Sequence, residues 1–205
     1  MILDGIEKDQ TIWIVGAGSS LTDYPKTNFK SGISIGINNV PIETDYHLWT
    51  NRKRWSEFGK NAKPKKSLII GEGISHENIR KFYQGSYVKL NYKDEPGLSL
   101  KYDGEVIYGH FRTAGCLAIM LAHVMGANKI YVIGMDGYTL HSREDLDSGA
   151  AAQHAYGRGF TDDASWKDCL EKDRQVGIAL DAIKEAGIEF KIVTPTVFKD
   201  HYCAG

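Results

Sequence analysis

Short apolar runs that end in small or polar residues recur along the chain and predict the strands of a buried sheet. The first run occupies 12–15 and stops abruptly at 16–20, where the sequence reads GAGSS. An apolar run of this length, bounded by turn residues, is typical of a strand whose two faces are both covered. The same pattern predicts strands at 33–37, 46–49, 67–70, 87–90, 106–108, 129–133 and 190–193.

Apolar residues with helical spacing predict a long helix from 113 to 125. They recur at the i, i+3, i+4 and i+7 positions of one face, at Leu117, Met120, Leu121 and Val124. Thr113 is the expected N-cap, and Gly126 is the expected end of the helix. A second long helix is predicted from about 164 to 186, and a helix of about two turns is predicted after Ser75.

Helices that alternate with apolar strands predict the α/β class. We expect a three-layer, Rossmann-like arrangement in which helices cover both faces of a mostly parallel sheet. The 205 residues suit a single domain that spans 1–205. One stretch, 137–163, has few aliphatic residues and many of Gly, Ser, Asp and His, so it cannot bury much core. We interpret it as a mobile lid loop inserted into the domain.

The composition is that of an ordinary globular protein, with 42% hydrophobic and 25% charged residues. No apolar stretch approaches the roughly 18 residues of a membrane span, and the N-terminus lacks the pattern of a signal peptide, so we expect a cytoplasmic protein. The net charge of −1 argues against a nucleic-acid partner. Three widely spaced cysteines, Cys116, Cys169 and Cys203, favour free thiols over disulfides or a zinc site. These properties leave open whether the chain forms a homo-oligomer.

Small and polar residues follow the ends of the predicted strands, where α/β sheets bind their ligands. We expect these residues to converge on one rim of the sheet and to hold a nucleotide: Gly16, Gly18, Ser19, Ser20, Asn38, Asn39, Thr50, Asn51 and Gly134. Each has a purely structural alternative, because glycines permit tight packing and polar side chains cap turns.

The pair Gly16-x-Gly18 after a strand resembles the start of a dinucleotide fingerprint, whose glycines let backbone N–H groups approach phosphate. Two departures count against a dehydrogenase. Leu21 replaces the third glycine, and Asn38 with Asn39 replaces the acidic residue that binds ribose about 20 residues further on. Amide side chains both donate and accept hydrogen bonds, so they suit a nucleobase edge or a ribose and favour a mononucleotide.

A candidate reaction centre follows the strand at 129–133, where Asp136 and Tyr138 stand. Three roles are open for Asp136: to orient a ribose hydroxyl, to coordinate a metal or to cap the next turn. The lid adds side chains suited to acid or base chemistry near neutral pH and to phosphate contacts, namely His141, His154 and Arg158. The seven histidines show no H-E-x-x-H or other close metal-ligand spacing, so we assign no metal ligand.

Four motifs, in this order, resemble two related groups of proteins. They read GAGSSL at 16–21, GINN at 36–39, TAG at 113–115 and ANKIYVIGMDGY at 127–138. One group is the bacterial lipooligosaccharide sialyltransferases, which transfer a sugar from a CMP donor. The other is the set of proteins similar to archaeal 6-hydroxymethylpterin diphosphokinase.

The resemblance to sialyltransferases implies that the glycine turn and the strand-end asparagines hold the CMP part, and we count Thr113 and Gly115 with them. It further implies that Tyr138 contacts the phosphate and that a lid histidine acts as base. Arg158 stands nearest the expected histidine in this chain, which leaves His154 or His141 for that role. The resemblance to the diphosphokinases implies ATP, Mg²⁺ and pyrophosphoryl transfer to a hydroxymethyl group, with Asp136 near the metal.

The sequence therefore predicts a nucleotide-dependent transferase. The first expectation is a glycosyltransferase that takes a CMP-type nucleotide sugar and a hydroxyl-bearing acceptor. Asp136 and Tyr138 would line its reaction centre, and the lid would close over the donor and add His141, His154 or Arg158 to stabilise the leaving phosphate. Two alternatives stay open, namely Mg-dependent pyrophosphoryl transfer from ATP and an inactive binding module on the same fold.

Overall fold

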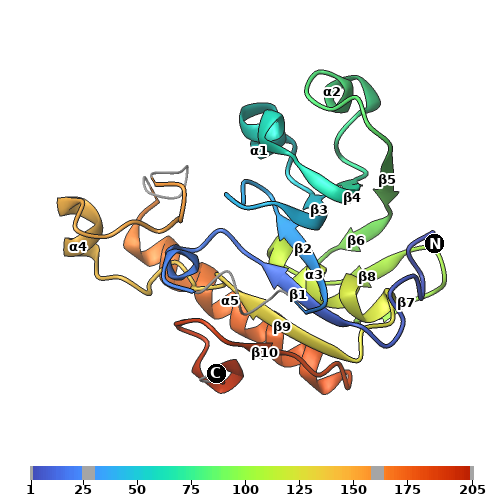
Figure 1. Cartoon of the computed structure of the whole chain (residues 1–205). Helices are drawn as coiled ribbons and strands as arrows, with labels where there is room; N and C mark the ends of the chain where they lie inside the picture. The colour runs from blue at the N-terminus through green and yellow to red at the C-terminus, as the bar shows by residue number, and fades with distance from the viewer. Residues whose placement is uncertain (1, 25–30, 158–163, 204–205) are drawn as a thin grey trace.

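The computed structural model describes residues 2–24, 31–157 and 164–203, and its central feature is a seven-stranded sheet (Figure 1). All neighbouring strands of this sheet pair in parallel, in the order β10-β9-β1-β2-β3-β4-β5. The strands are β1 (Thr11–Val15), β2 (Ile33–Ile37), β3 (Thr44–Trp49), β4 (Pro64–Gly71), β5 (Tyr87–Leu90), β9 (Lys129–Ile133) and β10 (Lys191–Ile192). The predicted α/β fold with a mostly parallel sheet is confirmed.

The strand order reverses beside β1. From β1 the chain adds β2 to β5 one after another on one side, and it then returns to place β9 and β10 on the other side. The carboxyl ends of β1 and β9 therefore form the topological switch point, where loops leave the sheet in opposite directions and leave room for a ligand.

Helices cover both faces of the sheet, as expected for three layers. On one face, α3 (Ala114–Val124) and α5 (Trp166–Glu185) join the largest apolar cluster, which includes Leu48. On the other face, α1 (Arg52–Phe58) and α2 (His76–Arg80) cover β3 and β4 in a second cluster, which includes Trp49. Neighbouring residues of a strand point to opposite faces, so one strand feeds both clusters. Figure 1 shows α1 and α2 grouped over β3 and β4, away from α5.

The helix α3 is apolar on all sides, not on one face as its spacing predicted. Every residue from 115 to 122 is buried, and so is Val124. The reason is its position, because the sheet, α5 and residues of a smaller sheet all pack around it. Thr113 caps it as predicted, since its Oγ1 accepts a 3.4 Å hydrogen bond from the N–H of Cys116.

A second, three-stranded sheet precedes α3 and was not predicted. It consists of β6 (Tyr92–Asp94), β7 (Lys101–Tyr102) and β8 (Ile107–Gly109), in the order β6-β8-β7. The sequence indicated only a strand at 106–108, because the partner strands are very short and lack a run of aliphatic residues. This sheet brings 92–94 next to the start of α3.

Two other stretches differ from the prediction. Residues 52–61, for which the sequence predicted no element, form α1 and the 3₁₀ turn η2 (Gly59–Asn61), and β4 begins at Pro64, before the start of the strand predicted at 67–70. Within the predicted lid loop, α4 (Arg143–Ser148) begins after its cap Ser142. Residues 158–163 of the lid lie outside the described residues, and the mobility of the lid stays a prediction.

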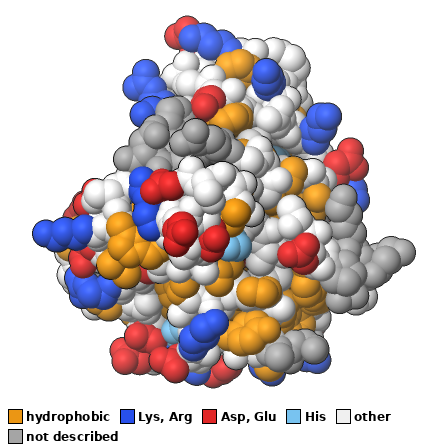
Figure 2. Space-filling view, turned by 90° about the vertical axis from the view of Figure 1, so that its left-hand side faces the viewer, with side chains coloured by type: hydrophobic (Ala, Val, Ile, Leu, Met, Phe, Trp, Pro, Cys, Tyr) orange, Lys and Arg blue, Asp and Glu red, His pale blue; other side chains and the backbone are white. Residues whose placement is uncertain are grey.

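The described surface is mixed in charge. On the face that carries α4, acidic and basic side chains are interspersed (Figure 2), as the net charge of −1 suggests. No helix in the described ranges is both long enough and apolar enough to cross a membrane.

Candidate functional site

A cavity of about 490 Å³ opens at the carboxyl ends of the strands, beside the switch point between β1 and β9. It lies in the size range of small-molecule sites. Many residues that the sequence placed on one rim line it together: Gly16, Gly18, Asn38, Asn39, Thr50, Asn51, Thr113, Gly115, Gly134, Asp136, Tyr138 and His154. Ser19, Ser20 and His141 are not part of the lining, and Arg158 lies outside the described residues.

The glycines of the turn after β1 serve contact with the turn after β9. A Cβ on Gly134 would lie 2.5 Å from the carbonyl oxygen of Gly16, so the two turns touch backbone to backbone. The N–H groups of Gly16 and Gly18 donate to the carbonyls of Ile133 (2.8 Å) and Gly134 (2.9 Å). The tight-packing alternative therefore accounts for these glycines, and their N–H groups are not directed at a ligand.

The carboxylate of Asp136 fills the centre of the turn after β1. It accepts a 2.8 Å hydrogen bond from the N–H of Ser20, a 3.2 Å bond from Oγ of Ser19 and a further bond from Oγ of Ser20. A Cβ on Gly18 would lie 2.5 Å from Oδ1 of Asp136, which explains the second glycine. The hydroxyls of Ser19 and Ser20 and the N–H of Ser20 are thus engaged within the protein, and their predicted contact with phosphate stays a prediction.

Asp136 is almost fully buried, with 3% of its surface exposed, and this burial affects its protonation. Burial raises the pKa of this carboxyl, while the hydrogen bonds from Ser20 and Ser19 and the nearby His141 lower it. Nε2 of His141 lies 2.7 Å from Oγ of Ser19, so this lid residue joins the same network. Asp136 thus acts as the internal anion of the turn, close to the capping role among its three predicted alternatives.

A second group of cavity residues surrounds the N-terminus of α3. Arg112 precedes the cap Thr113 and has a φ of +63°, a left-handed conformation that is uncommon for a residue with a side chain. The first N–H groups of a helix have no intrahelical acceptor and carry the positive end of the helix dipole. Arg112 and Arg54 of α1 both line the cavity together with Ala114 and Gly115. These are the features of an anion site.

Tyr138 links the turn after β9 to this anion site. Burial raises the pKa of its phenol, Asp173 raises it further, and Arg112 and Arg54 act in the opposite direction. Asp173 of α5 fixes the segment by accepting hydrogen bonds from the N–H groups of Tyr138 (2.7 Å) and Thr139 (2.9 Å). The protonated phenol can therefore donate a hydrogen bond in the neighbourhood of two guanidinium groups.

Sequence reasoning missed Arg112, Arg54 and Asp173. In the sequence, Arg54 is one of three consecutive basic residues, and Asp173 is one of many charged residues in a long predicted helix. The available signal for Arg112 was its place directly before the cap of a helix that the motifs had already singled out. The direction of the Arg112 side chain depends on the positive φ of its backbone, and the sequence alone does not predict that angle.

Asn38 is held at the end of β2 by a sharp return of the chain. Parallel neighbours β2 and β3 are joined by residues 38–43 alone, and a Cβ on Gly36 would lie 2.6 Å from Oγ1 of Thr44, so the return passes directly over the strand. The N–H of Asn38 donates to the carbonyl of Leu48 (2.9 Å), and Nε2 of His47 lies 2.5 Å from the carbonyl oxygen of Asn38. Because that oxygen only accepts, His47 is the donor.

The side chain of Asn38 has an unused acceptor. Its φ is +51°, and its Oδ1 is buried with no hydrogen-bond partner within the described ranges. A buried acceptor left without a donor costs about 1–3 kcal/mol, so a ligand that donates to it is favoured. Among the strand-end asparagines, Asn38 is therefore the one whose side-chain oxygen is available to bind a ligand.

The other two asparagines are used inside the protein. Oδ1 of Asn39 accepts a 2.9 Å hydrogen bond from Nδ2 of Asn61. Oδ1 of Asn51 accepts a 3.1 Å bond from the N–H of Arg54 and caps α1. For Asn51 the capping alternative therefore holds, although the residue still lines the cavity.

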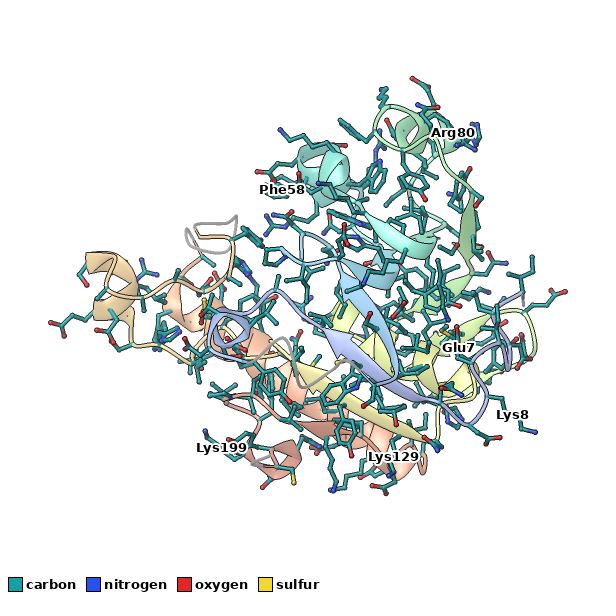
Figure 3. The ribbon with its side chains drawn as sticks, in the orientation of Figure 1. Glu7, Lys8, Phe58, Arg80, Lys129 and Lys199 are labelled. Carbon is teal, nitrogen blue, oxygen red and sulfur yellow. The ribbon has the colours of Figure 1, made fainter. Side chains whose placement is uncertain are left out.

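The described end of the lid spans the cavity mouth. The N–H of Ala155 donates to the carbonyl of Ala17 (2.9 Å), and His154 forms a backbone bridge with Gly18. The ring of His154 stacks on Tyr156 at 4.8 Å, and Tyr156 reaches Phe58, labelled on α1 in Figure 3, at 5.6 Å. The lid thus connects the glycine turn with α1, and His154 lies over the cavity between them.

Comparisons with known proteins bear on the fold. No protein-family model matches the chain, and no curated protein sequence matches it. The structure is similar to that of the sialyltransferase CstII from Campylobacter jejuni with cytidine-5'-monophosphate, at 13% identity and a TM-score of 0.53, over 95% of this chain and 84% of that chain.

Two further structures are more distant. A sialyltransferase CST-II with trisaccharide acceptor and CMP gives 12% identity and a TM-score of 0.48, over 94% of this chain and 84% of that one. A mammalian sialyltransferase gives 11% identity and a TM-score of 0.47, over 91% of this chain and 70% of that one. At 13% identity the likeness to CstII shows the fold alone, and that fold agrees with the predicted Rossmann-like class.

Proposed function

We propose that the protein is a glycosyltransferase that binds a CMP-type nucleotide sugar in this cavity. The observation that carries the proposal is the anion site formed by Arg112, the N-terminus of α3 and the phenol of Tyr138. In the reaction the bond between the sugar and the phosphate breaks, so negative charge develops on the phosphate. Fixed positive groups at that point stabilise the transition state.

The phosphate position differs from the one that the sequence suggested. The turn after β1 already holds the carboxylate of Asp136, so a phosphate there would meet a buried anion. The start of α3 offers N–H groups without intrahelical acceptors and a guanidinium. We therefore assign the phosphate to Arg112, Tyr138 and the N–H groups of Ala114 and Gly115.

The nucleoside is assigned to the strand ends near Asn38. Its buried Oδ1 needs a donor, which the amino group of cytosine or a ribose hydroxyl supplies. Cytidine is favoured by the resemblance of the motifs to sialyltransferases, and the structurally similar CstII was solved with cytidine-5'-monophosphate. Gly16, Gly18 and Gly134 shape the wall beside it.

The lid contributes after the donor has bound. His154 lies over the cavity on the side of the glycine turn, where the lid excludes water in the proposed complex. His141 acts indirectly, because it bonds to Ser19 outside the lining. A role for Arg158 stays a prediction.

Calorimetry with CMP, CTP and ATP, each with and without Mg²⁺, tests the proposal. We expect CMP to bind without metal and CMP to be released from a CMP-sugar in a subsequent assay. Binding of ATP that requires Mg²⁺, with none of CMP, would instead support the diphosphokinase alternative. Binding of CMP with no turnover of any CMP-sugar would support an inactive binding module.

A further inference from the structure

Among the described residues, two carboxylates line the cavity, and their hydrogen bonds differ. Both oxygens of the buried Asp136 accept hydrogen bonds from the turn after β1. Asp94, at the end of β6, has a side chain that is 33% exposed. Asp94 is therefore the carboxylate that a ligand in the cavity can reach.

A single oxygen of Asp94 is anchored. Its Oδ1 accepts a 2.8 Å hydrogen bond from the N–H of Phe111 and lies 3.5 Å from Nδ1 of His110. In the part of the chain that the structure describes, Oδ2 takes part in no hydrogen bond. The carboxylate thus has a fixed position and one oxygen that is open to a donor.

The other titratable groups of the described lining are less suited to accept a proton. Burial raises the pKa of Tyr92 and of Tyr138, so both phenols stay protonated at neutral pH. His154 belongs to the lid, stacks on Tyr156 and lies toward the glycine turn. An acceptor hydroxyl on the α3 side of the cavity would meet Asp94 first.

Asp94 lies beside the proposed phosphate position without occupying it. Phe111, whose N–H anchors Asp94, immediately precedes Arg112 in the chain. A base and a leaving group must lie on different sides of the reacting carbon but within a few ångströms of it. Asp94, which is held by Phe111, and a phosphate bound by the next residue, Arg112, meet this requirement of proximity.

We propose that Asp94 is the general base that activates the acceptor hydroxyl, an inference that rests on the proposed function. As the acceptor oxygen forms its bond to the anomeric carbon, its proton passes to Oδ2 of Asp94. The bond between that carbon and the phosphate oxygen breaks, and its electron pair leaves with CMP. Asp94 then releases the proton to solvent.

The substitution Asp94→Asn tests this role, because the amide keeps an oxygen for the N–H of Phe111. CMP-N-acetylneuraminic acid serves as donor and water as acceptor. We expect the release of CMP to fall roughly 100- to 10,000-fold while the calorimetric Kd for CMP stays within about threefold. Sodium azide, an anionic nucleophile that has no proton to lose, should restore CMP release and yield a glycosyl azide.

A matched control is Glu95→Gln, which changes an exposed neighbour outside the cavity lining and should leave turnover unchanged. CMP release by Asp94→Asn close to the wild-type rate would overturn the inference. So would a loss of CMP release that azide fails to restore, since Asp94 would then act in folding or binding. If the wild type releases CMP from no CMP-sugar, the proposed function itself fails, and the role of Asp94 fails with it.

Discussion

On the side of the cavity formed by the turns after β1 and β9, polar groups bind one another, whereas on the side formed by the start of α3 they face the cavity. The N–H groups of Gly16, Gly18 and Ser20 all have acceptors within the protein. Arg112 and the first turn of α3 border the open space. A conspicuous glycine motif can therefore serve internal packing, while under the proposed function a less conspicuous arginine provides the binding group.

Because the polar groups of the glycine turn bind one another, substitutions there should reduce stability more than affinity for CMP. Gly18→Ala should lower the free energy of unfolding by about 3 kcal/mol, because the new Cβ would press on the carboxylate of Asp136. Urea unfolding measures this change. Below the unfolding transition, the Kd for CMP should match that of the wild type; a large loss of affinity with unchanged stability would show that the turn binds the ligand.

A substitution of Arg112 should reduce affinity for CMP more than stability. Arg112→Gly removes the guanidinium but suits the φ of +63°, so we expect the Kd for CMP to rise about 30-fold, or about 2 kcal/mol, with no loss of stability. Calorimetry and thermal unfolding measure the two effects. Arg143→Ala, which removes an exposed side chain paired with Asp147, is the control. Unchanged affinity in Arg112→Gly would remove the anion site from the proposal.

His47 offers a test through pH. Burial lowers its pKa to about 4, so between pH 6.5 and 4 the unfolded chain binds a proton that the folded chain does not, and stability falls as the pH falls. From pH 6.5 to 5 the wild type should lose about 1.5 kcal/mol more than His47→Gln. Denaturant unfolding at several pH values measures the difference.

The same histidine separates two ways of holding Asn38. A glutamine amide can still donate to the carbonyl of Asn38, so His47→Gln should bind CMP almost as the wild type does. His47→Phe lacks the donor and should bind more weakly. Equal affinity of both variants would show that the clamp on Asn38 is not needed for binding.

The smallest effect is expected at Asn51. Asn51→Ala should cost about 1 kcal/mol of stability through the lost cap of α1 and leave the Kd for CMP unchanged. Thermal unfolding and calorimetry with CMP check both statements. A clear loss of affinity would return Asn51 to the binding residues.

Much of the fold was predictable because its causes are local. After its first residue, Lys129, the strand at 129–133 is an uninterrupted apolar run, and α3 carries its own cap in Thr113 and its stop in Gly126. By contrast, α1 has seven residues with a mixed pattern, and it is stabilised by contacts of Trp55 with residues far along the chain, the carbonyl of Asn78 and the ring of Phe82. Such an element gives little signal before the chain folds.

The convergence of strand ends was predictable for a similar reason, since parallel strands end at the same edge of a sheet. The use of each polar group was not. Asp136 and Ser20 are 116 residues apart, and which donor meets which acceptor depends on how closely two turns approach. The position of Asp94 depends on a small sheet whose short strands left almost no pattern.

The small sheet is formed by one continuous segment, residues 92–109. This segment lies between β5, the last strand of one half of the large sheet, and α3, the helix that leads to β9 in the other half. It contributes no strand to the large sheet, so the piece can change in length or sequence while the seven parallel strands keep their register. Under the proposals above, such changes would alter the choice of acceptor and leave the nucleotide end intact. Exchange of the exposed residues of this piece, with Asp94 and the buried Ile107 kept, is therefore a direct route to new acceptor specificity.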